Sequence, residues 1–313
     1  MKPLRQTFKA SIRQLLKDGG TLWHGYPFYY AQLQDREATP RYCYQWSEIT
    51  TPIKRRSSFA EVNENRLWNM QLAARDINGL LLHPGQIFGF WNRVARPTVA
   101  NGFREGPTLV GNRLMTDVGG GLCQISTTLF QALLWADCQI LERHNHSIDA
   151  HGDKRFFTLG QDATVAYGYK DLIVRNNSQV PLQLRLQVLA EKAEVTASVW
   201  GTEPKPVEVK VSSTVLAKLP PPDANGMPGW QVETIRYVRS QSRIEVIPNP
   251  SMLATDTFLA PPLTRGAGGV KSVASKKEIG MSSLESSGTG GLPYAPTDWQ
   301  ADYRTIDLYK PHV

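Results

Sequence analysis

Short apolar segments separated by turn-forming residues fill the second half of the chain, and they limit the possible folds more than any other sequence feature. Five of them follow one another between residues 162 and 216: DATVAYG, KDLIVRN, VPLQLRLQVLA, EVTASVWG and VEVKVSSTVL. Segments of this length that alternate or stay apolar between Gly, Asn and Pro are typical of strands joined in sequence by turns. The sequence therefore predicts an antiparallel β-meander.

Two helices are predicted before this meander. Residues 63–78 place apolar side chains at helical spacing and end at Asn78-Gly79, which favours a helix end there. A second helix is predicted directly after Gly121, because one helical face collects Leu122, Ile125, Leu129, Phe130, Leu133 and Leu134. The segments LLLHPGQIFGFWNRV and TLVGNRLM indicate further short strands. An antiparallel sheet with such helices packed on it is an α+β fold, with one helix starting at Cys123.

Changes in composition divide the chain into four parts. Residues 1–56 are interpreted as an N-terminal helical appendage and residues 57–200 as the main domain. Residues 201–265 are interpreted as a β-hairpin extension, in which residues 230–246 turn back near residues 240–242. Residues 266–313 are expected to be a mostly disordered tail, because residues 266–291 are rich in Gly, Ser and Lys and have few large apolar side chains.

The net charge and the cysteines indicate which binding partners and which cellular compartment to expect. The net charge is +7, but the basic residues are spread out, and the one dense run, 54–56, is interpreted as a solvated loop, so no nucleic-acid partner is expected. No apolar stretch approaches the roughly 20 residues of a membrane span, and no signal peptide is visible. The three cysteines show no C-x-x-C spacing, which favours a reducing compartment. We expect a cytoplasmic protein, with export by an unrecognised route as the alternative.

Cys123 lies where a glycine-rich turn enters the second helix. Gly119, Gly120 and Gly121 precede it, and glycine permits backbone conformations closed to other residues and a close approach by another chain. Unpaired N–H groups and the helix dipole at a helix N-terminus shift a thiol toward thiolate, and the same groups can hold an oxyanion. This pattern favours the nucleophile of a cysteine acyl-transfer enzyme. A small buried side chain at a tight turn is the alternative interpretation.

A general base is expected in the segment RHNHSIDAH. His144 and His146 are separated by one residue, so on a strand both would face the same side and could approach the thiol. Asp162 lies sixteen residues past His146 and could orient the imidazole, giving a Cys-His-Asp order. For His144 the alternative is a surface or hydrogen-bonded residue without a catalytic role.

Five segments together resemble the VanW family: HPGQIFGFWNRV, GFREGPTLV, VGGGLCQISTTLFQALL, ERHNHS and LGQDATVAYG. The resemblance covers residues 57–190. It implies a cysteine L,D-transpeptidase or carboxypeptidase-like activity on peptidoglycan, as assigned to some members, with Cys123 as nucleophile. It also implies that His146, directly before a serine, is the recurrent histidine and that His144 is the second choice.

The partner implied by the resemblance is a peptidoglycan stem peptide or a muropeptide. We expect substrate contacts from Gly119, Gly120, Gly121, Gln124 and Ser126, and neither a cofactor nor a metal. Wall-acting members usually carry an export signal or an anchor with wall-binding modules, and none is visible here. A cytoplasmic protein would meet peptidoglycan precursors or recycled muropeptides.

Two other classes of function stay open on the sequence. A non-catalytic module could hold a carboxylate or phosphate of a wall peptide or another anion at the glycine-rich helix start. A metal site could be built from Cys123, Cys138, His144 and His146, whose side chains suit zinc, although their spacing differs from that of common zinc fingers.

Overall fold

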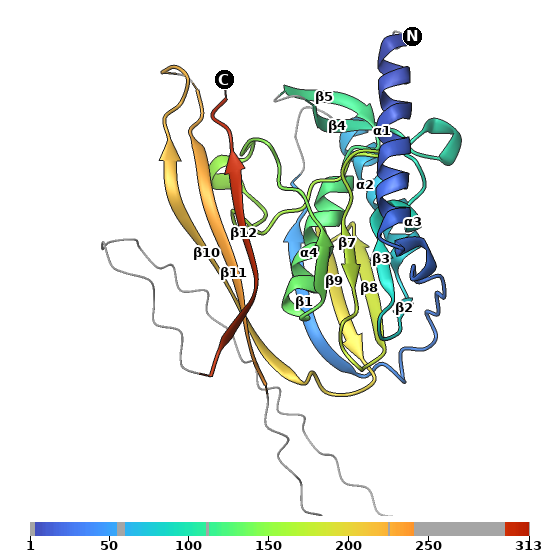
Figure 1. Cartoon of the computed structure of the whole chain (residues 1–313). Helices are drawn as coiled ribbons and strands as arrows, with labels where there is room; N and C mark the ends of the chain where they lie inside the picture. The colour runs from blue at the N-terminus through green and yellow to red at the C-terminus, as the bar shows by residue number, and fades with distance from the viewer. Residues whose placement is uncertain (1–3, 55–59, 111–112, 225, 241–297, 313) are drawn as a thin grey trace, which may run out of the picture. The chain divides into compact units, whose positions relative to one another are not determined.

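A computed structural model describes residues 4–54, 60–110, 113–224, 226–240 and 298–312 (Figure 1). These residues belong to one compact unit. Its α-helices are α1 (Leu4–Trp23), α2 (Ala60–Ile77), α3 (Phe90–Arg93) and α4 (Leu122–Trp135). Single 3-10 turns occur at η1 (Tyr26–Phe28), η2 (Val99–Asn101) and η3 (Gly152–Lys154). The two helices predicted from periodicity, α2 and α4, are confirmed.

All paired strands of the described residues are antiparallel, which confirms the α+β class. The largest sheet has the order β1-β9-β8-β2, with β1 (Tyr44–Pro52), β9 (Glu194–Gly201), β8 (Leu182–Leu189) and β2 (Leu80–Leu82). A second sheet has the order β3-β7-β6, with β3 (Ile87–Gly89), β7 (Ile173–Arg175) and β6 (Gln139–Glu142). The strands β4 (Glu105–Val110) and β5 (Arg113–Val118) form a hairpin.

A third sheet, β10-β11-β12, consists of β10 (Val207–Leu219), β11 (Gly229–Ser240) and β12 (Gln300–Tyr309). Within the range assigned to the hairpin extension, β10 and β11 form a hairpin whose turn lies between residues 219 and 229. Residues 230–240 lie in a single strand because β10 offers them a partner along nearly their whole length, and the turn near residues 240–242 stays a prediction. Residues 241–246 lie outside the described residues.

The two ends of the chain contribute strands that the sequence did not predict. Residues 1–56 contain α1, but they also supply β1, which pairs with β9 along the edge of the largest sheet. Residues 266–297 of the expected disordered tail lie outside the described residues. Its last part forms β12, which pairs with β11 from residue 300 to residue 309.

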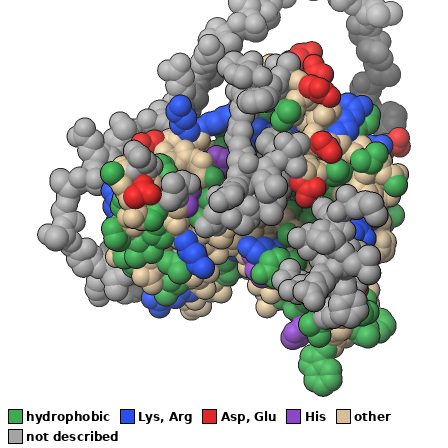
Figure 2. Space-filling model, turned by 90° about the horizontal axis from the view of Figure 1, so that it is seen from above, with side chains coloured by type: hydrophobic (Ala, Val, Ile, Leu, Met, Phe, Trp, Pro, Cys, Tyr) green, Lys and Arg blue, Asp and Glu red, His purple; other side chains and the backbone are tan. Residues whose placement is uncertain are grey.

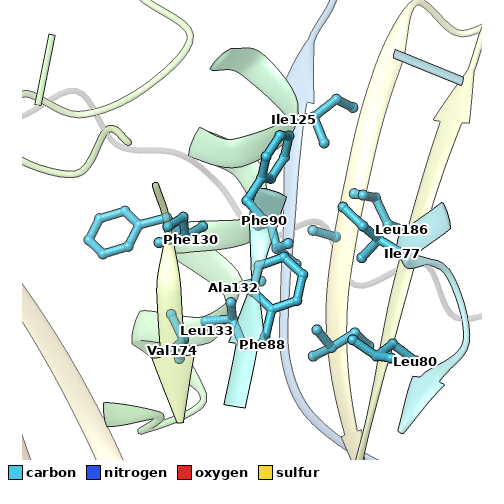
Figure 3. Packing of buried hydrophobic residues seen from close by; sticks show 14 of the residues in the cluster. Ile77, Leu80, Phe88, Phe90, Ile125, Phe130, Ala132, Leu133, Val174 and Leu186 are labelled. Carbon is cyan, nitrogen blue, oxygen red and sulfur yellow. The ribbon is translucent and has the colours of Figure 1, made fainter. Parts of the chain in front are cut away.

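Helix α4 lies at the centre of the core. Twelve of its fourteen residues are buried, so it has hardly any solvent-facing side, in contrast to the single apolar face read from the sequence. Figure 3 shows Ile125, Phe130, Ala132 and Leu133 of α4 among side chains from α2 and the surrounding strands. The polar residues of the helix are buried with the apolar ones, so they require hydrogen-bond partners inside the protein.

Ala163 provides partners for Ser126 and Thr127, and this explains why DATVAYG is not a strand. Thr127 of α4 accepts a hydrogen bond from the Ala163 amide and donates one to the Ala163 carbonyl, both at 3.1 Å. Ser126 donates to the same carbonyl at 2.6 Å. Because side chains of the helix take both backbone groups of Ala163, no neighbouring strand pairs with it. We call these two hydroxyls and Ala163 the Ala163 clamp.

The surface agrees with a scattered charge. On the face shown in Figure 2, Lys and Arg side chains lie among acidic, polar and apolar ones. Lys54 of the basic run is exposed, whereas Arg55 and Arg56 lie outside the described residues. In the part of the chain that the structure describes, no helix combines the length and the hydropathy needed to cross a membrane.

Candidate active site

Cys123 lies in the first turn of α4, as predicted, and its side chain is partly buried. Gly119 and Gly121 have φ of 96° and 102°, which favours glycine. A β-carbon on Gly121 would come within 2.7 Å of Met70, and one on Gly119 within 2.6 Å of Pro97. The loop therefore needs these glycines for its own turn and for packing against Met70 and Pro97 of the same chain. Contact of Gly119, Gly120 and Gly121 with a substrate stays a prediction.

Three groups surround the Cys123 thiol. The Thr164 hydroxyl lies 3.4 Å from Sγ, and the thiol donates to the Val165 carbonyl at 3.6 Å. His146 is the third group. Burial raises the pKa of the thiol, but the hydrogen bond with His146 and the charge of its imidazole outweigh burial and lower the pKa below its ordinary value. The surroundings therefore favour the thiolate.

His146 is held by Asp162 on the side away from the thiol. Its Nδ1 lies 2.5 Å from Asp162 Oδ2, and its backbone amide donates to the same oxygen at 2.7 Å. Burial lowers the pKa of His146, but the hydrogen bonds to Asp162 and Cys123 raise it overall to about 10. Since Nδ1 is taken by the carboxylate, Nε2 is the nitrogen left for the thiol. Phe157 stacks on the ring, with 5.9 Å between ring centroids.

The structure thus brings together Cys123, His146 and Asp162, three of the residues selected from the sequence. Asp162 is completely buried, and burial alone would raise the pKa of its carboxyl. The contacts with His146 and the charge of Arg143 outweigh burial and hold this pKa well below its usual range. A thiolate, an imidazolium and a carboxylate in this order are the parts of a cysteine acyl-transfer site.

Three further residues contact this carboxylate or its partner, and no motif pointed to them. Arg143 Nη2 donates to Asp162 Oδ1 at 3.0 Å, and the Tyr309 hydroxyl donates to the same oxygen at 2.5 Å. Arg143 Nη1 also donates to both oxygens of Asp307 at 2.6 Å. Arg143 stands inside the segment ERHNHS, so its neighbours are a signal that could have found it. Asp307 and Tyr309 lie in the expected tail, where the sequence offered none.

The remaining selected side chains have other partners. His144 Nε2 lies 3.0 Å from Glu142, which also binds Lys17 of α1, so this imidazole takes part in a different cluster. The Gln124 side chain accepts from Arg66 at 2.5 Å and donates to the Pro52 carbonyl at 3.0 Å. Ser126 belongs to the Ala163 clamp. The side chains of Gln124 and Ser126 are therefore engaged within the protein.

The backbone at the helix start bears on the predicted oxyanion site. The Gln124 amide donates to the Gly121 carbonyl at 3.0 Å. Within the described residues, the Cys123 amide has no such acceptor. The Cys123 amide is therefore a candidate donor to an oxyanion formed next to Sγ.

The alternative metal site is not assembled. Cys138 lies past the other end of α4, is 2% exposed, and has its pKa raised to about 12, chiefly by burial. Among the described residues, no group of three or more His, Cys, Asp or Glu side chains could hold a metal ion.

Lys170 and a nearby groove offer contacts for a ligand. The Lys170 ammonium lies 3.5 Å from the Asn145 carbonyl. Burial lowers the pKa of Lys170, while the charges of Cys123 and Asp162 oppose that change. A groove of about 360 Å³ lies beside Phe157, lined by Asp153, Arg155, Phe157, Thr158, Leu159, Ser213, Val215 and Val232.

The site lies in a region of the chain that matches known proteins. Residues 65–200 match the family model described as VanW like protein. The chain therefore contains a VanW-like domain. This VanW domain contains Cys123, His146 and Asp162, whereas Asp307 and Tyr309 lie beyond it.

Two curated relatives share this part of the chain. The vancomycin B-type resistance protein VanW of Enterococcus faecalis is 35% identical over 130 residues, which are 41% of this chain and 47% of that protein. The uncharacterized protein YoaR of Bacillus subtilis is 33% identical over 127 residues, 41% of each chain. The match thus spans less than half of each relative. No solved structure matches the chain.

Proposed function

We propose that this protein carries out cysteine-dependent acyl transfer on peptidoglycan-type peptides, as an L,D-transpeptidase or a carboxypeptidase-like enzyme. The observation that carries the proposal is the row of interacting side chains Cys123, His146 and Asp162. The Asp162 carboxylate binds Nδ1 of His146, and the imidazole lowers the pKa of the Cys123 thiol. A non-catalytic side chain would need neither an ionised thiol nor an oriented histidine.

In the first half of the reaction, the thiolate of Cys123 attacks the carbonyl carbon of a stem-peptide residue. A C–S bond forms, and the carbonyl electron pair moves to oxygen, where the Cys123 amide donates a hydrogen bond; one such donor contributes about 2.7–4 kcal/mol in comparable sites. When the intermediate collapses, the C–N bond breaks and His146 gives its Nε2 proton to the leaving amine. The product is a thioester on Cys123 and a released terminal amino acid.

In the second half, an acceptor attacks the thioester carbonyl. His146, neutral after the first half, takes a proton from the acceptor, and the C–S bond breaks to restore the thiolate. An amine acceptor gives transpeptidation, and water gives carboxypeptidase action. Asp162 keeps the proton on Nδ1 throughout, so that Nε2 can give and take protons.

Two neighbours of the triad fit a peptide that ends in a carboxylate. The Lys170 ammonium, which interacts electrostatically with Cys123 and Asp162, is a suitable partner for the free carboxylate of such a peptide. The groove beside Phe157 offers apolar and charged side chains for the remainder of the stem. Both features support the choice of wall-type peptides as substrate class.

The test is a covalent adduct on Cys123. The wild type, Cys123→Ser and, as a matched control, Cys43→Ser are incubated with a tetrapeptide muropeptide or a pentapeptide precursor, and the intact protein is weighed by mass spectrometry. Cys43 is exposed and outside the site, so its variant should behave like the wild type. We expect an acyl adduct in both that accumulates when no acceptor amine is supplied, and none in Cys123→Ser.

A contrary result has a clear form. If no adduct forms with any wall-type peptide while equilibrium binding of the same peptide survives in Cys123→Ser, the protein is the non-catalytic binding module that the glycine-rich helix start also allows. Adduct formation on Cys43 alone would equally remove Cys123 from the mechanism.

A further inference from the structure

Strand β12 turns its side chains in an unusual direction. In a strand with one buried face, apolar residues normally point inward and polar residues outward. Here Asp307 and Tyr309 are 4% and 0% exposed, whereas Ile306 and Leu308, which alternate with them, are 55% and 49% exposed. A shift of one residue would bury the two apolar side chains instead. The observed register thus sacrifices apolar burial, and some other interaction must favour it.

The interaction that favours this register is the contact with Asp162. Tyr309 reaches Asp162 Oδ1 directly, and its hydroxyl also accepts a hydrogen bond from the Gly160 amide at 2.9 Å. Asp307 reaches the same carboxylate through Arg143, which lies between the two acids with 3% of its side chain exposed. The inward face of β12 therefore meets the candidate active site.

We propose that β12, which lies beyond the VanW domain, completes the active site, with Tyr309 and Asp307 acting as positioning residues for the Asp162–His146 pair. This rests on the proposed function for the reaction, but only on the described contacts for the geometry. Nothing in the family match assigns either residue a role, because the match ends at residue 200.

The two oxygens of Asp162 accept hydrogen bonds from different partners, and this shows how β12 positions the carboxylate. Oδ1 accepts hydrogen bonds from Tyr309 and Arg143, while Oδ2 accepts from the amide and Nδ1 of His146. With Oδ1 fixed, the carboxylate cannot rotate, and Oδ2 stays in line with the imidazole. Asp307 holds Arg143 by two hydrogen bonds, so the guanidinium stays in place. Removing either support leaves Asp162 freer and weakens its hold on the imidazolium.

The test reads the thiol directly and needs no peptide. In a Cys43→Ser background, the rate of Cys123 alkylation by iodoacetamide is measured from pH 5 to pH 10. Tyr309→Phe, which keeps the ring, and Asp307→Asn, which keeps the shape, should move the midpoint of the profile to higher pH. The midpoint moves because Asp162 holds the imidazolium of His146 less firmly in both variants, and this imidazolium stabilises the thiolate. If the protein turns over a muropeptide, kcat should fall roughly tenfold or more with little change in KM, as is typical when the partner of an active-site histidine is lost.

Asp302→Asn is the matched control. Asp302 lies on the same strand and binds Arg236 of β11 at 2.5 Å, so its loss weakens the docking of β12 without touching Asp162. The proposal predicts an unchanged alkylation profile for this variant, even where its melting temperature falls.

The outcomes separate the two roles of the strand. If Asp302→Asn moves the profile as far as Tyr309→Phe does, or if neither Tyr309→Phe nor Asp307→Asn moves it, β12 is only structural and the proposal is overturned. Should Tyr309→Phe fail to fold, Asp307→Asn carries the test alone. A shifted profile in a protein that forms no acyl adduct would retain the positioning role and reject only the proposed reaction.

Discussion

The Ala163 clamp allows a stability prediction whose size follows from its hydrogen bonds. Thr127→Val keeps a side chain of nearly the same volume but removes the hydroxyl that both accepts from and donates to Ala163. Both residues are essentially buried, at 0% and 1% exposure, so water cannot replace the lost partner. A stranded buried N–H costs about 1–3 kcal/mol and a lost hydrogen bond about 1 kcal/mol. The Ala163 carbonyl keeps Ser126, so we expect a loss of about 2–3 kcal/mol in the free energy of unfolding.

Urea unfolding followed by circular dichroism measures this loss, with Thr50→Val as control. The Thr50 hydroxyl forms a hydrogen bond with the Thr196 hydroxyl at 2.9 Å, but at an exposed position on β1. Its substitution should change the free energy of unfolding by less than about 0.5 kcal/mol. Equal effects of Thr127→Val and Thr50→Val, or a change below 1 kcal/mol in Thr127→Val, would refute the assignment of the clamp as the link between α4 and residues 162–165.

Two further predictions concern the imidazole. His146→Ala should lower the turnover of a muropeptide by roughly 10²-fold or more. His144→Ala should do less, because that ring bonds Glu142; the reverse order in kcat/KM would transfer the base role to His144. The His146 contribution to stability, complete below its unfolded pKa near 6.5, is lost as the pH rises toward its folded pKa of about 10. The lowered pKa of Cys123 contributes in the opposite sense up to the unfolded thiol value near 8.5, so the free energy of unfolding of the wild type should fall less below about pH 8.5 than between about pH 8.5 and 10. In Cys123→Ala, which lacks the thiol, the free energy of unfolding should fall from about pH 6.5 without this opposing contribution. Denaturant unfolding at several pH values measures this. If the thiol were not ionised, both proteins would show the same pH dependence.

Local patterns in the sequence were sufficient to predict the position of Cys123, the proposed nucleophile, in the first turn of a helix. The change from period two to period 3.6 after Gly121 fixes the start of α4, and this places Cys123 in its first turn. His146 and Asp162 were selected from spacing and family motifs, and the structure brings both to the thiol. These choices were accessible because each depends on residues close in sequence or within one motif.

The remaining parts of the site depend on contacts that no periodicity describes. DATVAYG has the alternation of a strand, but its backbone bonds the buried hydroxyls of α4, and a pattern of polarity cannot tell a hydroxyl that faces water from one that faces a backbone. In β12 the apolar side chains point outward, so a reading based on alternation would assign the wrong face. Tyr309 is 147 residues from Asp162, and only tertiary packing brings them together.

The same long-range contacts account for the lowered pKa of the thiol. Taking charges out of water costs several kcal/mol per ion, and pairing compensates only when geometry and hydrogen bonding are complete. Along the buried chain Cys123, His146, Asp162, Arg143 and Asp307, negative and positive groups alternate, so every inner member has an opposite charge on both sides. A lone imidazole beside a buried thiol would lose its proton to desolvation. The imidazolium persists here because Asp162 is itself held by Arg143, and Arg143 in turn by Asp307. The lowered pKa of the thiol at one end therefore depends on the Asp307 carboxylate of β12, a strand outside the VanW-like domain.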